Sequence, residues 1–388
     1  MTDNLLTIKQ EVINWRRYFH QHPEPSLKEY LTSAKIKEVL EQLNIPYEMV
    51  GETGILATIK GQIGSGKTIL LRADIDALEL ADETKTSYQS KHPGLNHACG
   101  HDGHIAALLG AAKLLNQQKA HIQGTIKLAF QQAEEIGAGA RLFVQDGHLY
   151  DVDEVFGIHL DSSIPVGKIA ASPGANSASC DIFKVRVSGL SAHAAQPHLG
   201  RDALLSAANM VVELQRIVAR EIDPLDSVVV AIGVLNAGTR YNIVANEAFF
   251  EGTVRAFSHK IRKQTLDSIK RIISSLAIAH QTTVDIDIYD AAAPLINDEK
   301  SAHLAAIVAN KIVGDKNVLT KPSLKLGADD FADFLALVPG IFCRVGTRNE
   351  ENPKTYFPHH HEQFDIDEDS LLIAVELYHN YALTYLKN

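Results

Sequence analysis

The segment DIFKVRVSG, Asp181–Gly189, begins the region that decides the fold, because apolar and polar residues alternate in it as in a strand with one buried face. The same alternation returns over Glu247–Ala256. The other elements expected in this region are a helix over Ala203–Ala219, a strand over Ser227–Leu235, a helix over Ile261–His280 and a strand over Thr283–Tyr289. The resulting order, βαββαβ, is typical of a small ferredoxin-like sandwich.

On both sides of this region the pattern is that of an α/β domain. Helices are expected at about residues 4–20, 31–43, 102–115 and 138–145, and strands at 54–60, 68–73, 124–130 and 154–160. After the sandwich, PLINDEKSAHLAAIVANKI resumes the α/β pattern. The sequence therefore predicts an α/β domain with a mixed, partly parallel sheet over residues 1–177 and 293–388, and a ferredoxin-like domain inserted over residues 178–292.

The composition restricts the function classes. A chain of 388 residues is long enough for two domains, and its net charge of -10 argues against nucleic acid or an anionic membrane as the main partner. No apolar run approaches the roughly 18 residues of a membrane span, and the N-terminus lacks the pattern of a signal peptide. The three scattered cysteines make a disulfide framework improbable, so we expect a cytoplasmic protein.

One motif indicates a different class of function. GQIGSGKT, Gly61–Thr68, fits the phosphate-loop pattern of nucleotide-binding proteins, which requires a strand before the loop and a helix after it. Here the loop is followed by ILLRADIDAL, which is rich in strand-forming residues. We therefore interpret the motif as a Gly/Ser hairpin turn with Lys67 in solvent, and reject the nucleotide-binding alternative.

The chain has 18 histidines, and one cluster lies in NHACGHDGH, Asn96–His104. Cys99 and His101 are two residues apart, so in an extended backbone both side chains can face the same side. A thiolate and an imidazole are good ligands for zinc and similar metals. The alternative is a half-buried cysteine beside a loop in which Asp102 caps the next helix.

Two adjacent carboxylates, Glu134 and Glu135, follow an expected strand in FQQAEEIG. In an extended segment neighbouring side chains point in opposite directions, so one can bind a metal while the other acts as a general base. The alternative is an ordinary acidic helix start. His159 ends another strand, and YFPHHHEQFDIDE contains three consecutive histidines. Together these segments suit a site for two metal ions.

The motifs also resemble a known family. RRYFHQHPEP, RADIDAL, NHACGHDGH, QQAEE, GIHL, SAHAAQPH, GTRYNIVANEA, GADDF and HHHEQFDIDE occur in the order seen in the aminoacylase and carboxypeptidase G family of metallohydrolases. The subgroup most similar contains N-acyl-amino-acid amidohydrolases, auxin-conjugate hydrolases and N-acetyldiaminopimelate deacetylases. The sequence departs from the subgroup at Glu79, Gln132, Ala245 and Asp329, which weakens any assignment to a particular substrate.

The resemblance implies two divalent metal ions per chain, zinc or manganese, with nickel or cobalt as alternatives. The resemblance makes Glu134 the general base. It implies five metal ligands, of which Cys99 would bridge both ions: Cys99, His101, Glu135, His159 and His360. His360 is chosen because the family's ligand stands four residues before the phenylalanine that corresponds to Phe364.

The resemblance also gives the inserted domain the roles of a lid and of the interface of a homodimer. His193, Asn242 and Arg255 match positions that close over the substrate, with His193 reaching the partner's site. The expected reaction is hydrolysis of the amide bond of a small N-acyl, and in particular N-acetyl, amino acid. The alternatives within the family are a carboxypeptidase or dipeptidase and an N-acetyldiaminopimelate deacetylase.

Overall fold

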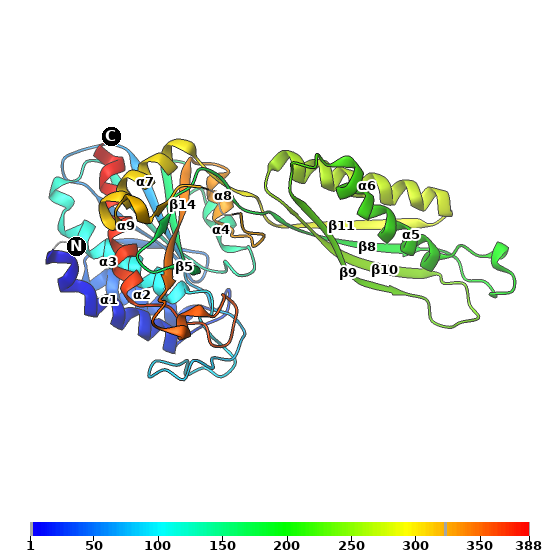
Figure 1. The fold of residues 1–388 in the computed structure, drawn as a ribbon, viewed down its shortest axis with the longest axis horizontal. Helices are drawn as coiled ribbons and strands as arrows, with labels where there is room; N and C mark the ends of the chain where they lie inside the picture. The colour runs from blue at the N-terminus through cyan, green and yellow to red at the C-terminus, as the bar shows by residue number, and fades with distance from the viewer. Residues whose placement is uncertain (1–2, 322–323, 388) are drawn as a thin grey trace. The chain divides into compact units, whose positions relative to one another are not determined.

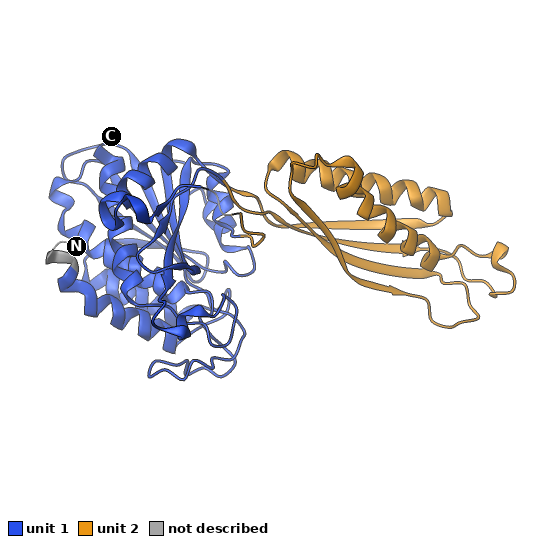
Figure 2. Cartoon of the chain, viewed as in Figure 1, with its two compact units in different colours: residues 1–174, 296–323, 329–388 blue, residues 175–295, 324–328 orange. Residues whose placement is uncertain are grey.

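A computed structural model describes residues 3–321 and 324–387, and these residues form two compact units (Figures 1 and 2). Unit 1 comprises residues 1–174, 296–323 and 329–388, and unit 2 comprises residues 175–295 and 324–328. The expected boundaries, 178 and 292, each differ from these by three residues. Segment 324–328, which we expected in the α/β domain, belongs to unit 2.

Unit 1 is an α/β unit with a mixed eight-stranded sheet in the order β1-β2-β4-β3-β5-β14-β6-β13. The strands are β1 (Tyr47–Val50), β2 (Gly54–Lys60), β3 (Thr68–Asp74), β4 (Thr125–Gln131), β5 (Glu154–Pro165), β6 (Ile169–Ala170), β13 (Val318–Leu319) and β14 (Gly340–Arg348). The neighbours β4, β3, β5 and β14 are parallel. Their carboxyl ends therefore meet at one edge of the sheet, where the candidate site lies.

The helices of unit 1 supply most of the remaining core. They are α1 (Asp3–Gln21), α2 (Tyr30–Gln42), α3 (His101–Gln117), α4 (Gly139–Gln145), α7 (Glu299–Val313), α8 (Phe331–Leu335) and α9 (Asp369–Lys387). Helix α3 packs against α1 and α9 and is buried along most of its length. This burial on all sides holds the first turn of α3, which carries His101 and His104, in a fixed place. No helix of the described residues has the length and apolarity needed to cross a membrane.

Unit 2 has the ferredoxin-like topology expected from the sequence. Its elements are β8 (Cys180–Ser188), α5 (Ala203–Arg216), β9 (Val228–Ala237), β10 (Glu247–Ala256), α6 (His259–His280) and β11 (Thr283–Ala292). The four strands form an antiparallel sheet in the order β11-β8-β10-β9. Phe183, Phe250 and Ile269 belong to its own apolar core. Strands β7 (Gly174–Ser177) and β12 (Leu295–Asn297), at the unit boundaries, pair in a separate two-stranded sheet.

The structure corrects the interpretation of Gly61–Thr68. Thr68 begins β3, so no helix follows the loop as a phosphate loop requires. The segment is not a hairpin turn either, because β4 lies between β2 and β3 in the sheet. The hairpin prediction was wrong because the strand between β2 and β3 is β4, which comes more than fifty residues later in the chain and is not visible in the local sequence. Lys67 is exposed as expected, with its ammonium 5.0 Å from the centre of the Tyr385 ring.

Candidate metal centre

Cys99 and His101 lie where the loop after β3 turns into α3, which begins at His101. The loop is a turn and not the extended segment that we expected, because Gly100 adopts a left-handed backbone with φ +88°. Asp102 does not cap the helix, since the N-cap residue is Gly100. In the first turn, Asp102 Oδ1 accepts the Gly103 N–H at 2.9 Å, and Asp102 Oδ2 accepts hydrogen bonds from Arg16 Nε at 2.9 Å and His20 Nδ1 at 2.8 Å.

The structure brings the five predicted metal ligands together. Cys99 Sγ lies 3.6 Å from His159 Nε2. One oxygen of Glu135 lies 3.8 Å from His101 Nε2, and the other lies 3.5 Å from His360 Nε2. Cys99, His101 and Glu135 each offer a ligand atom within 4.8 Å of the others. Their role as metal ligands stays a prediction.

The spacings fit a metal better than they fit hydrogen bonds. Tetrahedral zinc holds nitrogen and oxygen ligands about 3.4 Å apart and sulfur and nitrogen ligands about 3.6 Å apart, given bond lengths of about 2.0–2.3 Å. The distances of 3.5, 3.6 and 3.8 Å lie near these values. His101 Nε2 and Glu135 Oε1 are buried and have no hydrogen-bond partner among the described residues. A cation between them would satisfy both atoms.

Glu134 and Glu135 lie in a turn after β4, and not in the extended segment that we expected. The turn begins at Ala133, which has φ +54° and donates its N–H to the buried carboxylate of Glu29 at 2.9 Å. The N–H of Glu135 donates to Asp76 Oδ2 at 3.0 Å. As a result both glutamates approach His101 Nε2, at 3.9 and 3.8 Å, instead of pointing apart.

The three consecutive histidines have three different environments. His360, which has φ +64°, donates its N–H to Ala98 O and faces Glu135. His361 turns away, since its ring stacks on Phe357 and its Nδ1 accepts the Gln363 N–H.

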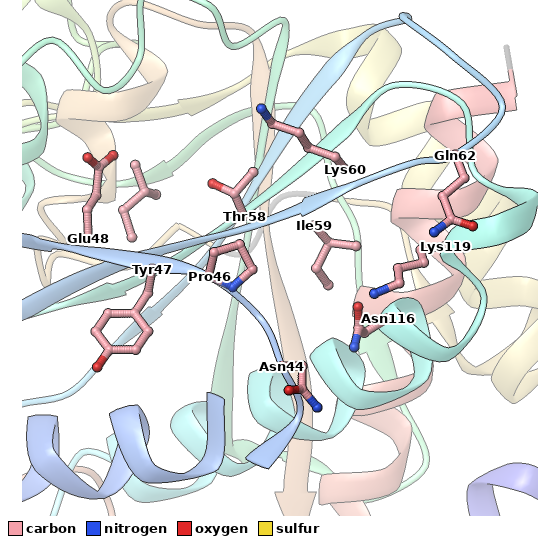
Figure 3. Close-up of a pocket in the computed structure, with 11 residues that line it drawn as sticks. Asn44, Pro46, Tyr47, Glu48, Thr58, Ile59, Lys60, Gln62, Asn116 and Lys119 are labelled. Carbon is pink, nitrogen blue, oxygen red and sulfur yellow. The ribbon is translucent and has the colours of Figure 1, made fainter. Parts of the chain in front are cut away.

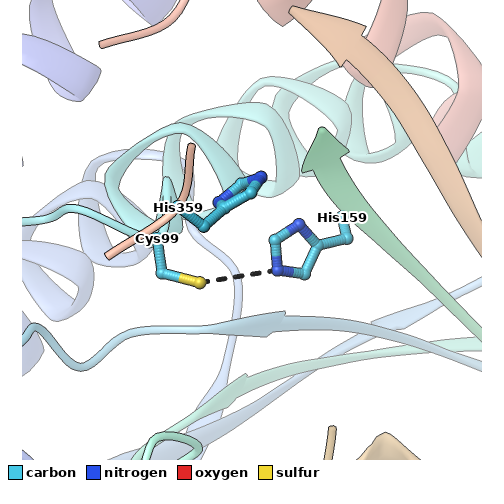
Figure 4. Close-up of side chains that lie close together, drawn as sticks. All are labelled: Cys99, His159 and His359. Atoms are coloured by element: carbon cyan, nitrogen blue, oxygen red, sulfur yellow. Dashed lines mark hydrogen bonds between the residues drawn. The ribbon is translucent and has the colours of Figure 1, made fainter. Parts of the chain in front are cut away.

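His359 forms another possible ligand group with Cys99 and His159 (Figure 4). Nothing in the motif favoured this residue, because the family's spacing to Phe364 selects His360 alone of the three histidines. Its Nδ1 is buried and has no hydrogen-bond partner among the described residues. His359 is therefore a candidate that the sequence analysis missed.

The electrostatics indicate an excess of negative charge at the cluster: against the effect of burial, Asp74 and Asp76 raise the pKa of His101 to about 10. Burial and the negative charges of Glu135 and Glu134 raise the pKa of the Cys99 thiol well above its ordinary value. Burial also raises the pKa of Glu135 to about 7, and burial together with Asp329 raises the pKa of Glu134. A divalent cation would oppose all of these shifts. Burial lowers the pKa of His159 well below its ordinary value, so this imidazole is neutral, as a ligand must be.

A second layer of side chains supports the cluster. The Asp76 carboxylate lies 3.3 Å from His101 Nδ1 and accepts the Ser26 hydroxyl. Asp74 forms an ion pair with the buried Arg72 at 2.7 Å, and Arg72 also pairs with Asp330 at 2.8 Å. These aspartates lie in RADIDAL and GADDF, motifs that we recognised without assigning them roles. Acidic residues at the end of an apolar strand, as in RADID, are the signal that would have found Asp74 and Asp76.

In unit 2 the predicted substrate residues fall into two places. His193 bridges to Ile243, and the Ala194 N–H donates to Asn242 O at 3.1 Å, so His193 and Asn242 share one end of the sheet. Arg255 lies near the other end of β10, where Val254 is opposite Asp181. At about 3.3 Å per residue, the two ends of the ten-residue strand β10 are roughly 30 Å apart. The three side chains of a single unit therefore cannot contact the same small substrate.

A separate cavity of about 480 Å³ lies on unit 1 (Figure 3). It is lined by residues of β1, of the loop before β1, of β2 and of the end of α3, and by Lys60 and Lys119. None of the predicted site residues lines it.

The fold and the cluster together define a class of protein. A thiol, imidazoles and carboxylates converge at the carboxyl ends of parallel strands, in an α/β unit that carries an inserted ferredoxin-like unit. This combination is that of a hydrolase with a two-metal centre.

Comparison with known proteins identifies the family. The model of peptidase family M20/M25/M40 matches residues 70–384, and the chain belongs to this family, which confirms the resemblance. An N-acetyl-L-cysteine deacetylase of Bacillus subtilis is 38% identical over 96% of this chain and 87% of its own length. Thermostable carboxypeptidase 1 of Saccharolobus solfataricus is 36% identical over 96% of this chain and 95% of its own. A B. subtilis structure described as a dinuclear metal binding peptidase of the M20 family matches with a TM-score of 0.85 and 32% identity, over 98% of this chain and 99% of that one.

Proposed function

We propose that this M20 hydrolase cleaves the amide bond of N-acyl amino acids, with Glu134 as the general base. The observation that carries the proposal is the turn after β4, which places two mostly buried glutamates beside His101. Glu135 also lies 3.5 Å from His360 Nε2, and Glu134 has no such contact, which supports Glu135 as the ligand and Glu134 as the base. The similarity to a deacetylase of N-acetylcysteine supports an N-acyl amino acid as substrate.

The residues that would hold two divalent ions are Cys99, His101, Glu135, His159 and His360. Zinc suits the thiolate and the imidazoles of this set, and manganese suits its carboxylate. When bound, such ions polarise an amide carbonyl and lower the pKa of a water molecule. Glu134 would accept a proton from that water and return it to the leaving nitrogen. Burial raises the pKa of the Glu134 carboxyl, and a raised pKa strengthens a carboxylate as a general base.

We also propose a homodimer formed through β9 of unit 2. Of the two edge strands in the sheet, β11 carries Asp285, Asp287 and Asp290, and such charges protect an edge from pairing. The other edge, β9, has the sequence VVVAIGVLNA without a charged residue, and Val234 and Leu235 are 40% and 47% exposed on it. An uncharged, apolar edge is the one suited to pair with a second copy.

The dimer gives a reason for the separation of His193 from Arg255. If one active site takes Arg255 from its own chain and His193 and Asn242 from the partner, the two ends of the unit 2 sheet serve different sites. Arg255 would hold the substrate carboxylate in a bidentate pair, and His193 would donate to the developing oxyanion.

A carboxypeptidase is the second candidate, because a relative with that name is 36% identical over nearly the whole chain. Both reactions cleave an amide next to a free carboxylate. Hydrolysis rates on N-acetyl, N-benzoyl and indole-acetyl amino acids, measured beside a dipeptide panel with zinc or manganese added, separate the two. A higher kcat/KM for dipeptides would replace the first proposal by the second, and no hydrolysis of either panel would contradict both.

A further inference from the structure

His104 is a fully buried histidine that the proposed chemistry does not use. It lies in the first turn of α3, three residues after His101. The two imidazole rings stack with centroids 5.4 Å apart. The His104 ring also meets the edge of His159, with centroids 4.9 Å apart. The residue therefore contacts two predicted ligands without being one of the five.

The hydrogen bonds of His104 determine its tautomer. The backbone N–H of Leu160 donates to His104 Nε2 at 2.9 Å. A ring nitrogen that accepts a hydrogen bond carries no proton, so the ring is neutral and its proton is on Nδ1. That proton is donated to Asp74 Oδ1, and Arg72 pairs with the other oxygen of Asp74.

Leu160 connects this bond to the metal cluster. The ring of His159 donates its Nδ1 proton to the carbonyl of Leu160 at 2.7 Å, since a carbonyl can only accept. In a neutral ring that donates from Nδ1, Nε2 keeps its lone pair. This Nε2 atom lies 3.6 Å from Cys99 Sγ. Both backbone groups of Leu160 are held by imidazoles, one on each side.

The sheet explains why an imidazole is needed at this place. Strand β3 pairs with β5 only as far as Gly157, so the N–H of Leu160 lies beyond the end of that pairing. His104 supplies the acceptor that β3 does not provide, and a buried N–H without an acceptor would cost free energy.

We propose that His104 is a positioning residue: its neutral ring bridges Asp74 and the Leu160 N–H, and thereby directs His159 Nε2 toward Cys99. This inference rests on the proposed ligand role of His159. Supporting hydrogen bonds behind a metal ligand typically change metal affinity by about 10–100-fold. A histidine that only fills the core would affect stability without changing metal affinity.

The test is calorimetric titration of the full-length, metal-stripped chain with Co²⁺, together with the absorption spectrum of bound Co²⁺. His104→Phe keeps a ring but loses both hydrogen bonds, and it should weaken binding of one ion about 10–100-fold and change the spectrum. His104→Gln, which can return an acceptor to the Leu160 N–H, should recover much of the affinity. The control is Leu109→Ala in the buried part of α3, which should lower the unfolding temperature of the metal-free protein and leave Co²⁺ affinity unchanged.

Folded His104→Phe that binds both ions with wild-type affinity would overturn the proposal. If His104→Phe does not fold, His104→Asn replaces it, because an asparagine can donate to Asp74 but cannot reach the Leu160 N–H. Equal affinities of His104→Gln and His104→Asn would then overturn the proposal. His159→Ala separates the two levels: if it binds Co²⁺ normally, the ligand assignment fails, whereas normal binding by His104→Phe alone rejects only the role of His104.

Discussion

Ala133 shows how one backbone angle sets the chemistry of the residues after it. Its φ of +54° turns the chain immediately after β4. The bend is held by the Glu29 carboxylate, which accepts the Ala133 N–H, and by Gln132, whose side chain donates to Val50 O at 2.9 Å. Gln132 is one of the positions at which the sequence departs from the subgroup, and its side-chain amide is the donor of that bond. The turn is what allows two consecutive glutamates to face the same histidine.

Glu134→Gln should lower turnover by about 10²–10⁴-fold and leave metal content nearly unchanged, because the proposed base is lost while all ligands remain. Metal content by mass spectrometry and initial rates on the best N-acyl substrate check this. Glu135→Gln is the matched control and should lose metal together with activity. The reverse pattern would mean that the two roles are exchanged.

The three consecutive histidines give a second prediction. His360→Ala should lower metal occupancy because it removes a ligand, while His361→Ala should not, because its ring stacks on Phe357 away from the cluster. His359→Ala tests the choice of His360. The family's four-residue spacing to Phe364 predicts normal metal occupancy in this variant, whereas the possible ligand group of His359 with Cys99 and His159 predicts a loss of metal. Chelator competition on the three purified variants distinguishes these outcomes. Normal occupancy in His360→Ala would reject the chosen register.

The candidate residues were predictable from the sequence because metal chemistry restricts residue types, and Cys99, His101, Glu135, His159 and His360 do converge in the structure. Local backbone geometry was not predictable in the same way. The Cys99 loop turns at Gly100, where a glycine is compatible with a positive φ, whereas the Glu134 turn depends on a positive φ at Ala133, which the residue type does not indicate. His359 was missed because the approach of its ring to Cys99 depends on how the histidine turn folds back.

At the scale of elements, the prediction succeeded where periodicity is strong and failed where pairing is distant. Strand β2 was expected at residues 54–60 and is found there, and strand β10 at residues 247–256 likewise. The prediction of a hairpin at Gly61–Thr68 was wrong because β2 pairs with β4, and not with β3, which follows it in the sequence. Local sequence determines where a strand forms, but the partner is chosen by packing across the whole unit.

A buried carboxyl group joins β5 to α9 and gives a third prediction. Tyr381 donates its hydroxyl to Glu154 Oε1 at 2.5 Å, and burial raises the pKa of Glu154 to about 7. The folded chain then binds a proton more tightly than the unfolded chain, whose carboxyl has a pKa near 4.5. This contribution to stability is fully present below about pH 4.5 and is lost as the pH rises through about 7.

Glu154→Gln should therefore flatten the decline of stability between pH 5 and 7, with a difference of up to about 3 kcal/mol across the range. Urea unfolding of the metal-free protein at several pH values measures it. Glu299→Gln, on the first turn of α7, is the control and should follow the wild-type curve. If Glu154→Gln also follows that curve, Glu154 is ionised in the folded chain and the predicted linkage is absent.

At the scale of the whole molecule, the proposed dimer predicts complementation. His193→Ala and Glu134→Gln chains should each be inactive, and mixing them should restore activity, because a mixed dimer has one site with an intact Glu134 from one chain and an intact His193 from the other. At random exchange of equal amounts, half of the dimers are mixed, so about a quarter of all sites should work. The mixture is assayed beside each variant alone.

Exchange of subunits has to be shown in the same samples, for example with one variant tagged and recovered together with the other. If exchange occurs and activity stays absent, His193 does not act across an interface. Leu235→Lys on the uncharged edge β9 provides a second measurement, since it should shift the protein toward monomer in sedimentation. Tyr289→Lys on β11, which is similarly exposed, should not.

The insertion of unit 2 also affects how the chain is made. Strand β14 pairs in parallel with β5, so Gly340 lies opposite Val155, and the whole of unit 2 is synthesised between them. At translation rates of about 5–20 residues per second, β5 waits on the order of ten seconds or more for this neighbour to leave the ribosome. During that time its apolar edge is open to wrong partners, whereas unit 2, with its own core, can already be folded. A nascent chain of this protein therefore has most need of a chaperone while its inserted unit emerges.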